Sequence, residues 1–223
     1  MLPIYQALLM TPCEGPPFSR AAHETHRLDT PVPLDQRSPR LDGMHLREAA
    51  VTEPDSIRLL GDYFGSRELE FTEVGGVYTT RFPEAETFTP PAGVFLLVID
   101  DDNAAVGCGG IRLLPQAAAD NAPGTAGERA RQLEAGTVTE ATPVRFEVKH
   151  VWLSEAARGK GWAIALMNEL ERRAHEFGAT QLVLDTNARL TAAARLYTRL
   201  GYEQTEPYND NANATNWYAK QLS

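Results

Sequence analysis

Two glycines and two basic residues form a short stretch that could bind an anionic ligand. Arg158, Gly159, Lys160 and Gly161 lie between a strand-like segment at 144–154 and the start of an amphipathic helix. The first N–H groups of a helix have no partner inside it, and the helix dipole adds partial positive charge at that end. A glycine exposes the backbone to a ligand, so the pattern favours a phosphate or pyrophosphate site. A plain tight turn is the alternative that this stretch alone leaves open.

Two common phosphate-binding motifs do not fit this stretch. The P-loop pattern requires Lys and then Ser or Thr directly after its last glycine, but Trp162 follows Gly161. The dinucleotide pattern G-x-G-x-x-G requires a third glycine at the position that Ile164 occupies. The sequence therefore supports neither a P-loop nor a Rossmann site.

The composition limits the partners and the compartment. The 223 residues are 43% hydrophobic, which is enough for a core, and the formal net charge is −9. Binding to a nucleic-acid backbone requires clustered Lys and Arg, so this balance disfavours a nucleic-acid partner. The sequence contains neither a run of 18 apolar residues nor a zinc-type spacing of His and Cys, so we expect no membrane span and no metal site. Its two cysteines indicate no disulfide framework, which is typical of a reducing cytoplasm.

The chain divides into an N-terminal extension and one domain. Residues 1–43 hold seven of the fifteen prolines and show little periodicity, which predicts an extended arm. Such an arm can complete a homodimer, and this role stays open. We expect the domain at 44–223, and we interpret its Ala-, Gly- and Glu-rich stretch at 115–142 as an inserted loop.

Strand and helix patterns alternate along the domain. Strands are predicted at 44–49, 94–100, 104–114, 144–154, 181–187 and 216–222. Helices are predicted at 51–64, 163–177 and 190–202, and a long loop at 72–93 is predicted to contain a short helix at 82–88. The unit from 144 to 187 runs strand, glycine turn, helix, strand, so its two strands should be parallel. These elements define an α/β to α+β fold with a mixed sheet.

The first of these helices carries an explicit start signal. Thr52 and Asp55 form a capping pattern, and Ile57, Leu60 and Phe64 recur at helical spacing. We therefore expect Thr52 to cap the helix and the three apolar side chains to face the core.

Three segments in this order resemble the core of the GCN5-related N-acetyltransferase (GNAT) superfamily. The strand FEVKHVWLS at 146–154 precedes the loop RGKGWA at 158–163, which matches the family pattern R/Q-x-x-G-x-G/A. The segment AARLYTRLGYE at 193–203 matches the helical signature A-x-x-L-Y-x-x-x-G-[FY]. The resemblance covers about 44–222, and the ending PYNDNANATNWYAKQL is similar to an uncharacterised bacterial branch.

This resemblance implies both a fold and an activity. The implied fold is the GNAT acyl-CoA N-acyltransferase fold, a central mixed sheet flanked by helices in which the strands at 144–154 and 181–187 splay apart. The implied activity is an N-acetyltransferase that moves an acetyl group from acetyl-CoA to a primary amine of a small molecule or peptide by direct attack. Loops at 72–93 and 203–215 are implied to form the acceptor site.

The resemblance also implies which residues bind the donor. Those implied beside the pantetheine are Val151, Trp152 and Leu153. Those implied around the pyrophosphate are Arg158, Gly159, Lys160, Gly161, Trp162, Ala163 and Ile164. Many relatives carry an asparagine where this chain has Leu190, and Asn187 is the candidate to replace it.

Amine acylation requires a base for the ammonium and an acid for the leaving thiolate. The resemblance implies Tyr197 as the acid, although this tyrosine could simply be a core residue of its helix. Glu147 and Asp185 are the candidate bases, each with the alternative of a salt-bridged strand residue, and a water relay without a single base also stays open. His150 is more typical of a core histidine, on the face of Phe146, Val148 and Trp152.

There are two alternatives to this hypothesis: a nucleophilic cysteine, and a protein that keeps the fold without catalysis. Cys108 has no visible activating partner, and direct transfer needs no acyl-enzyme, so a nucleophilic cysteine is not expected. The alternative function is a CoA-binding sensor or interaction module that keeps the fold without catalysis.

Overall fold

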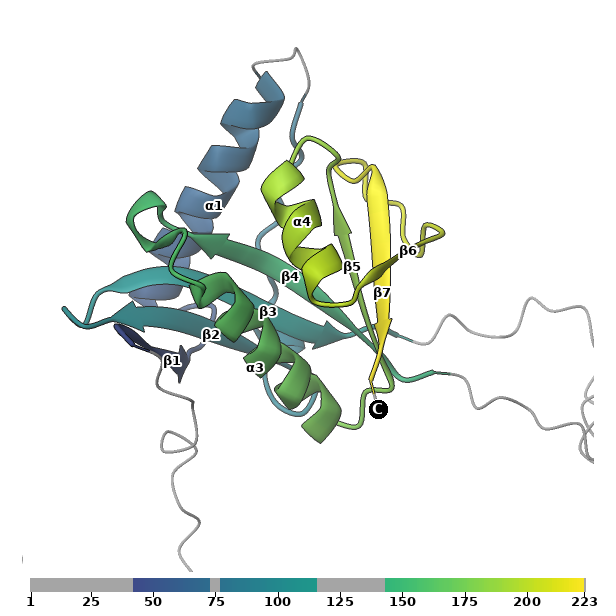
Figure 1. The fold of residues 1–223 in the computed structure, drawn as a ribbon, viewed down its shortest axis with the longest axis horizontal. Coiled ribbons are helices and arrows are strands. Elements are labelled where there is room, and N and C mark those ends of the chain that lie inside the picture. Colours follow the sequence, from purple (N-terminus) through teal and green to yellow (C-terminus); the bar gives the residue numbers. More distant parts are fainter. Residues whose placement is uncertain (1–41, 73–76, 116–142, 223) are drawn as a thin grey trace, which may run out of the picture. The chain divides into compact units, whose positions relative to one another are not determined.

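The computed structural model describes residues 42–72, 77–115 and 143–222 (Figure 1). The predicted arm, up to residue 41, and the predicted insertion, from residue 116 to 142, lie outside these ranges. None of the helices in the described part of the chain is long and apolar enough to cross a membrane.

A seven-stranded mixed sheet forms the centre of the domain, with the order β1-β2-β3-β4-β5-β7-β6. The strands are β1 (Met44–Glu48), β2 (Gly93–Asp100), β3 (Ala105–Leu113), β4 (Arg145–Leu153), β5 (Gln181–Thr186), β6 (Glu203–Thr205) and β7 (Asn216–Gln221). Among the strand pairs of the described residues, only β4–β5 is parallel, as the strand–turn–helix–strand unit predicts. The mixed-sheet prediction is therefore confirmed.

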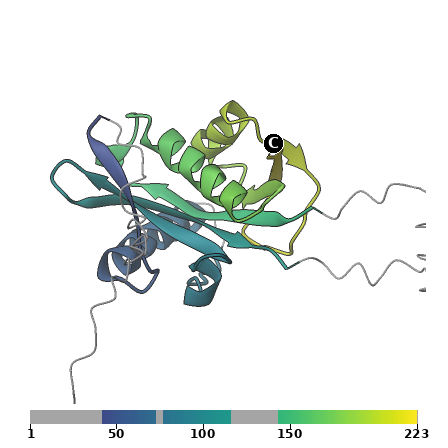
Figure 2. The same cartoon turned by 90° about the horizontal axis from the view of Figure 1, so that it is seen from below.

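Helices cover both faces of the sheet (Figure 2). The helices are α1 (Pro54–Thr72), α3 (Trp162–Glu176) and α4 (Thr191–Arg199), with short 3-10 turns η2 (Ala85–Phe88) and η4 (Glu155–Ala157). On the α3 face, Leu166, Met167 and Leu170 are fully buried, and each contributes about 1.5–3 kcal/mol through its burial. On the α1 face, Leu59, Leu60 and other apolar side chains form a second core cluster.

The start of α1 differs from the sequence prediction. The helix begins at Pro54, and the Glu53 carboxylate accepts hydrogen bonds from Arg47 and from the Ala50 N–H, so Thr52 and Asp55 form no capping pair.

The buried face of α1 also differs from the prediction. Ile57 is 51% exposed, whereas Leu59 is fully buried. The buried stripe of Ser56, Leu59, Leu60 and Phe64 leaves Ile57 roughly a quarter turn from its centre.

A bulge in the middle of β4 redirects its side chains. His150 has a φ of 57°, and the register against β3 shifts between Cys108 and Gly110. Upstream of the bulge, Phe146 and Val148 pack in the α3-side cluster, but Trp152 packs with the α1-side cluster. The prediction that His150 shares one face with all three residues is therefore wrong, because the extra residue of a bulge reverses the alternation.

The two parallel strands, β4 and β5, diverge toward their C-terminal ends. The ladder pairs Arg145–Glu147 of β4 with Gln181–Val183 of β5 and ends there. Both strands continue beyond it, to Leu153 and Thr186, and Figure 1 shows them diverging. This splay was expected from the family resemblance, and it leaves one edge of the upper half of β4 without a neighbouring strand.

Candidate active site

The glycine loop offers open backbone at the start of α3. Gly159 and Gly161 have φ values of 76° and 81°, a conformation that side-chain-bearing residues rarely adopt. A Cβ added at either position would meet no atom within 4 Å. The two glycines therefore present their backbone to empty space rather than to a neighbouring element.

The N–H groups of this loop point to the same conclusion. The N–H groups of Ile164 and Ala165 both donate to the Gly161 carbonyl, at 3.0 and 3.3 Å. No backbone hydrogen bond to another described residue uses the N–H groups of residues 159–163. Unpartnered N–H donors at the positive end of a helix suit a pyrophosphate. The loop therefore has the backbone geometry that the family resemblance implies for pyrophosphate binding.

The side chains of this loop have local partners. Arg158 donates from Nε to the Leu153 carbonyl at 3.1 Å, and the Lys160 ammonium lies 4.5 Å from the centre of the Trp162 ring. Trp162 is buried in the α3-side core, with its ring close to Gly43. Of the implied pyrophosphate residues, Trp162 can thus offer only its backbone.

The implied pantetheine residues lie on β4 above the end of the parallel ladder. Val151 lines the adjoining cavity, Leu153 is buried, and Trp152 turns its side chain toward the α1 side. Their β3 edge is paired, since Cys108 faces Trp152 and Gly107 faces Leu153. The opposite edge faces the splay, which leaves it accessible to an extended ligand.

Asn187 already makes two hydrogen bonds. Its Nδ2 donates to the Asn213 carbonyl at 3.1 Å, and its Oδ1 accepts from the Arg189 N–H at 3.2 Å. Asn187 and Leu190 both line the cavity, so the role of Asn187 in binding the donor stays a prediction.

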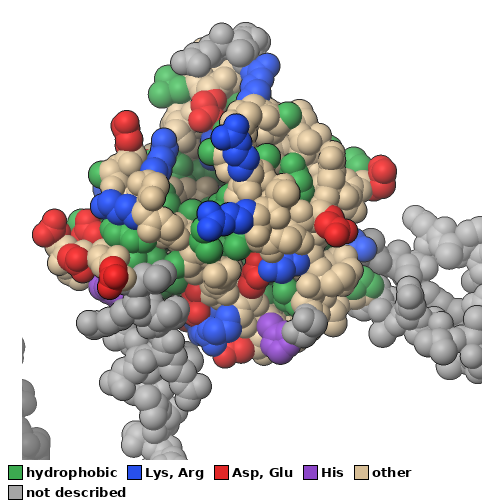
Figure 3. Space-filling model, in the orientation of Figure 1, with side chains coloured by type: hydrophobic (Ala, Val, Ile, Leu, Met, Phe, Trp, Pro, Cys, Tyr) green, Lys and Arg blue, Asp and Glu red, His purple; other side chains and the backbone are tan. Residues whose placement is uncertain are grey.

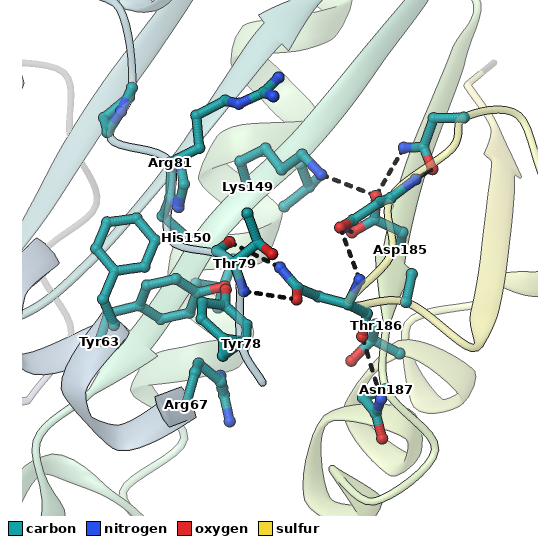
Figure 4. A pocket seen from close by; sticks show the side chains of 18 of the residues that line it. Tyr63, Arg67, Tyr78, Thr79, Arg81, Lys149, His150, Asp185, Thr186 and Asn187 are labelled. Atoms are coloured by element: carbon teal, nitrogen blue, oxygen red, sulfur yellow. Dashed lines mark hydrogen bonds and ion pairs between the residues drawn. The ribbon is translucent and has the colours of Figure 1, made fainter. Parts of the chain in front are cut away.

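A cavity of about 600 Å³ opens between α1, the splay and α4 (Figures 3 and 4). Figure 3 shows a hollow with hydrophobic side chains inside it and Lys and Arg side chains around it. One wall contains Val151, Ala193 and Tyr197, from the region implied for the donor. The other wall contains residues of α1 and of the segments 77–88 and 209–214, which fall largely in the two loops implied for the acceptor.

The α1 contribution to this cavity was not predicted. Tyr63, Arg67 and Phe71 line it at intervals of four residues, on one side of the helix. This spacing is visible in the sequence, but the predicted helix ended at residue 64, so Arg67 and Phe71 were assigned to no element.

Glu147 lies at the centre of a buried polar network. Its side chain is completely inaccessible to solvent, and its carboxylate is 2.6 Å from the Arg112 guanidinium and 2.9 Å from the Lys149 ammonium. The Tyr208 hydroxyl and the Asn209 amide also donate to it, at 2.9 and 3.1 Å. Both carboxylate oxygens are therefore engaged.

Of the two carboxylates in this network, Asp185 is the one that reaches the cavity wall. Its carboxylate accepts hydrogen bonds from Lys149 at 2.8 Å, Asn209 at 2.7 Å and Asn211 at 3.1 Å. Burial alone would raise the pKa of Asp185, but the Lys149 charge and the three hydrogen bonds together lower it. The carboxylate is thus ionised at neutral pH and weakly basic.

Tyr197 is brought to the cavity by α4. Its ring packs 6.0 Å from those of both Tyr202 and Tyr218, and its side chain is largely buried. Burial is the main cause that raises the pKa of Tyr197. The phenol therefore keeps its proton at neutral pH, as a proton donor must.

His150 lies among aromatic rings in the cavity lining, whereas Cys108 is a core residue. The His150 ring packs against Tyr63, Phe64 and Phe88, and burial, followed by the charges of Lys149 and Arg112, lowers its pKa to about 3. Cys108 is fully buried, which raises the pKa of its thiol. The protonated thiol fits the expectation that Cys108 is not a nucleophile, and an imidazole of such low pKa binds a proton weakly.

Across residues 42–72, 77–115 and 143–222, no three His, Cys, Asp or Glu side chains are arranged to hold a metal ion.

Known proteins share this fold. The acetyltransferase of the GNAT family from Staphylococcus aureus MU50 superposes with a TM-score of 0.58 at 14% identity, covering 81% of this chain and 99% of that one. This likeness concerns the fold, which is an acetyltransferase fold.

Sequence comparison identifies the family. A model of the acetyltransferase (GNAT) family matches residues 62–202, so the protein belongs to this family, which uses acetyl-CoA. An uncharacterised N-acetyltransferase of Schizosaccharomyces pombe (strain 972) is 26% identical over 124 residues, covering 56% of this chain and 60% of the relative. The aminoglycoside N(6')-acetyltransferase type 1 of Serratia marcescens is 33% identical over 67 residues, covering 30% of this chain and 45% of the relative.

Proposed function

We propose that this protein transfers an acetyl group from acetyl-CoA to a primary amine of a small molecule or peptide. The observation that carries the proposal is the cavity, which places Tyr197 and the open edge of β4 opposite a separate wall from α1 and the two loops. Donor and acceptor can therefore meet in one space, as direct attack requires.

Acetyl-CoA supplies the reactive thioester, and the protein's own groups hold and protonate it. The N–H groups of residues 159–163 bind the pyrophosphate, and the unpaired edge of Val151 to Leu153 binds the pantetheine. The neutral amine attacks the acyl carbon, the carbon–sulfur bond breaks, and Tyr197 gives its proton to the departing sulfur. The proton that the attacking nitrogen loses passes through water and restores the phenol, so an amide and a free thiol are formed.

The network around the two carboxylates bears on the choice of base. The Glu147 side chain is completely inaccessible to solvent, and the Lys149 charge helps to keep Asp185 ionised. A carboxylate of lowered pKa removes a proton from an ammonium inefficiently. These contacts favour the water relay, with Asp185 at the cavity wall orienting the acceptor rather than deprotonating it.

The test is an acetyl-transfer assay with a panel of primary amines, in which the release of CoA thiol is followed. We expect turnover with at least one amine, and we expect Tyr197→Phe to lower kcat by about 10²- to 10⁴-fold, the usual contribution of a general acid. Acetyl-CoA binding, measured by calorimetry, should be unchanged in this variant. Binding of acetyl-CoA without turnover across a broad panel would instead identify a CoA-binding module.

A further inference from the structure

Arg67 is a mostly buried guanidinium in the wall of the cavity. Its side chain is 15% exposed and lies on the second half of α1. Nη1 donates to the carboxylate of Glu70 at 2.8 Å, and the guanidinium carbon lies 5.3 Å from the centre of the Tyr63 ring. These contacts fix the guanidinium on the aromatic side of the cavity, beside Tyr63 and Tyr78 and across from Asp185 (Figure 4).

Part of this guanidinium remains available. Among the described residues, the Arg67 guanidinium donates to Glu70 and also interacts with the Tyr63 side chain, and no acceptor is in hydrogen-bonding geometry with Nε or Nη2. Neither nitrogen is among the polar atoms that are buried without a partner, so both keep some exposure on a residue that lines the cavity. Nε and one terminal nitrogen form the planar fork that matches a carboxylate with two parallel hydrogen bonds.

The other inward-facing charges of the cavity are already matched. Lys149 lies between Glu147 and Asp185, and Arg112 pairs with Glu147. The remaining charged lining residues, Arg81, Glu84 and Asp210, are exposed. Among the inward-facing charged residues of the lining, the unmet hydrogen-bonding capacity is therefore that of Arg67, a cation, and it calls for an anion on the ligand.

Arg67 and Tyr197 line the same cavity of about 600 Å³. A pocket of this size holds a small ligand, so an anion on Arg67 and an amine near Tyr197 can belong to one molecule.

The cavity is roofed on its acceptor side. The Asn213 side chain donates to the Thr79 carbonyl at 2.9 Å and accepts from the Thr79 N–H at 3.0 Å, which ties the segments 77–82 and 209–214 together. A polypeptide would have to part this contact, whereas a small molecule fits beneath it. The roof therefore favours a small acceptor over a protein chain.

We propose that the acceptor is a small amine that also carries a carboxylate, and that Arg67 binds this carboxylate through Nε and Nη2. The proposal rests on the proposed acetyl transfer and names the acceptor class for it. A carboxylate suits the site better than a phosphate, because Arg67 already shares its charge with Glu70, and the other inward-facing cations, Lys149 and Arg112, are paired with carboxylates, which leaves little positive charge for a dianion. The rings of Tyr63, Phe71 and Tyr78 contact the apolar part of such an acceptor.

The first experiment compares acceptors that differ only in the carboxylate. Phenylalanine, phenylalaninamide and phenethylamine, and likewise tyrosine and tyramine, are offered with saturating acetyl-CoA. We expect kcat/KM to be at least tenfold higher for each acid than for its amide or decarboxylated counterpart. Equal or better turnover of the counterparts would overturn the proposal.

The second experiment tests Arg67 itself. Arg67→Gln should raise KM for the acid acceptor at least tenfold, with kcat and the KM for acetyl-CoA within about twofold of wild type. Glu70→Gln is the matched control, because it removes the same surface ion pair and keeps the guanidinium. An unchanged KM in Arg67→Gln, or an equal rise in Glu70→Gln, contradicts the role of Arg67. Thermal melts establish that both variants fold.

A binding assay separates failure of this inference from failure of the proposed function. If no amine is acetylated, 3-phenylpropanoate is titrated into the protein in the presence of acetyl-CoA and measured by calorimetry. Saturable binding that disappears in Arg67→Gln but persists in Glu70→Gln supports the carboxylate site without any turnover. Absence of binding to the wild-type protein overturns it.

Discussion

The ammonium of Lys149 lies 2.8 Å from the carboxylate of Asp185, so an ion pair joins β4 to β5 just above the point where their hydrogen bonds end. The last paired residues are Glu147 and Val183, and the two strands diverge from there. Lys149 also contacts Glu147 at 2.9 Å, so one cation pairs with a carboxylate from each strand, and Arg112 supplies the second positive charge at Glu147. A side-chain ion pair thus connects β4 and β5 just beyond their last backbone pairing.

Loss of this cation should destabilise the fold. Lys149→Met leaves two buried carboxylates with one partner fewer, and removal of one member of a buried ion pair costs about 3–5 kcal/mol. Urea unfolding measures the change. The control is Arg47→Gln, which breaks a pair with Glu53 whose members are more than a third exposed, and it should cost less than about 1 kcal/mol. Comparable losses in both variants would refute a special role of Lys149.

The free energy of unfolding should decrease as the pH is lowered, because His150 is neutral in the folded protein. Its pKa is lowered from 6.5 to about 3, so the unfolded chain binds the proton more readily than the folded protein. Stability from this residue is therefore complete above pH 6.5 and declines as the pH falls toward 3.

Replacement of His150 isolates this effect. His150→Phe retains an aromatic ring against Phe64 and Phe88 and should flatten the loss of unfolding free energy between pH 6.5 and 3. Unfolding by urea at several pH values provides the comparison. His175→Gln is the control at an exposed histidine of α3, and it should follow the wild-type profile. A wild-type slope in His150→Phe would show that the residue does not control this pH range.

The glycine loop should be sensitive to a single methyl group. Gly161→Ala places a Cβ on a backbone with φ of 81°, which costs about 1–2 kcal/mol, and directs it into the space assigned to the pyrophosphate. We expect acetyl-CoA affinity to fall at least tenfold by calorimetry. Gly61→Ala is the matched control: it lies within α1 with open space around it and should stabilise the helix by about 0.5–1 kcal/mol. Unaltered affinity in Gly161→Ala would remove the loop from the donor site.

Local sequence pattern predicted the elements that bury continuous apolar runs. β2, whose residues from Gly93 to Ile99 are all buried, and α3, with its stripe at Leu166 and Leu170, were both predicted. β6 was missed because its three residues, Glu203–Thr205, are polar and exposed and are held only by pairing with β7.

The details of the site depended on tertiary structure. The bulge at His150 reverses which side chains face α1, and no local pattern marks it. The partners of Glu147 come from three separate segments, among them Arg112 on β3 and Tyr208 near the end of the chain. The sequence could therefore identify the carboxylate but not its surroundings, which decide whether it can act as a base.

The contact between Asn213 and Thr79 should control which acceptors fit. Asn213→Ala removes both hydrogen bonds across the roof, each worth about 0.5–1.5 kcal/mol, and should free the segments 77–82 and 209–214 from one another. We expect KM for a small acceptor to rise several-fold and bulkier amines to become substrates, while KM for acetyl-CoA stays unchanged. Asn216→Ala is the control, because this side chain accepts a hydrogen bond from the neighbouring Thr215 rather than from the roof. Steady-state kinetics with amines of increasing size decide the matter: an unchanged size limit in Asn213→Ala would mean that the roof does not select the acceptor.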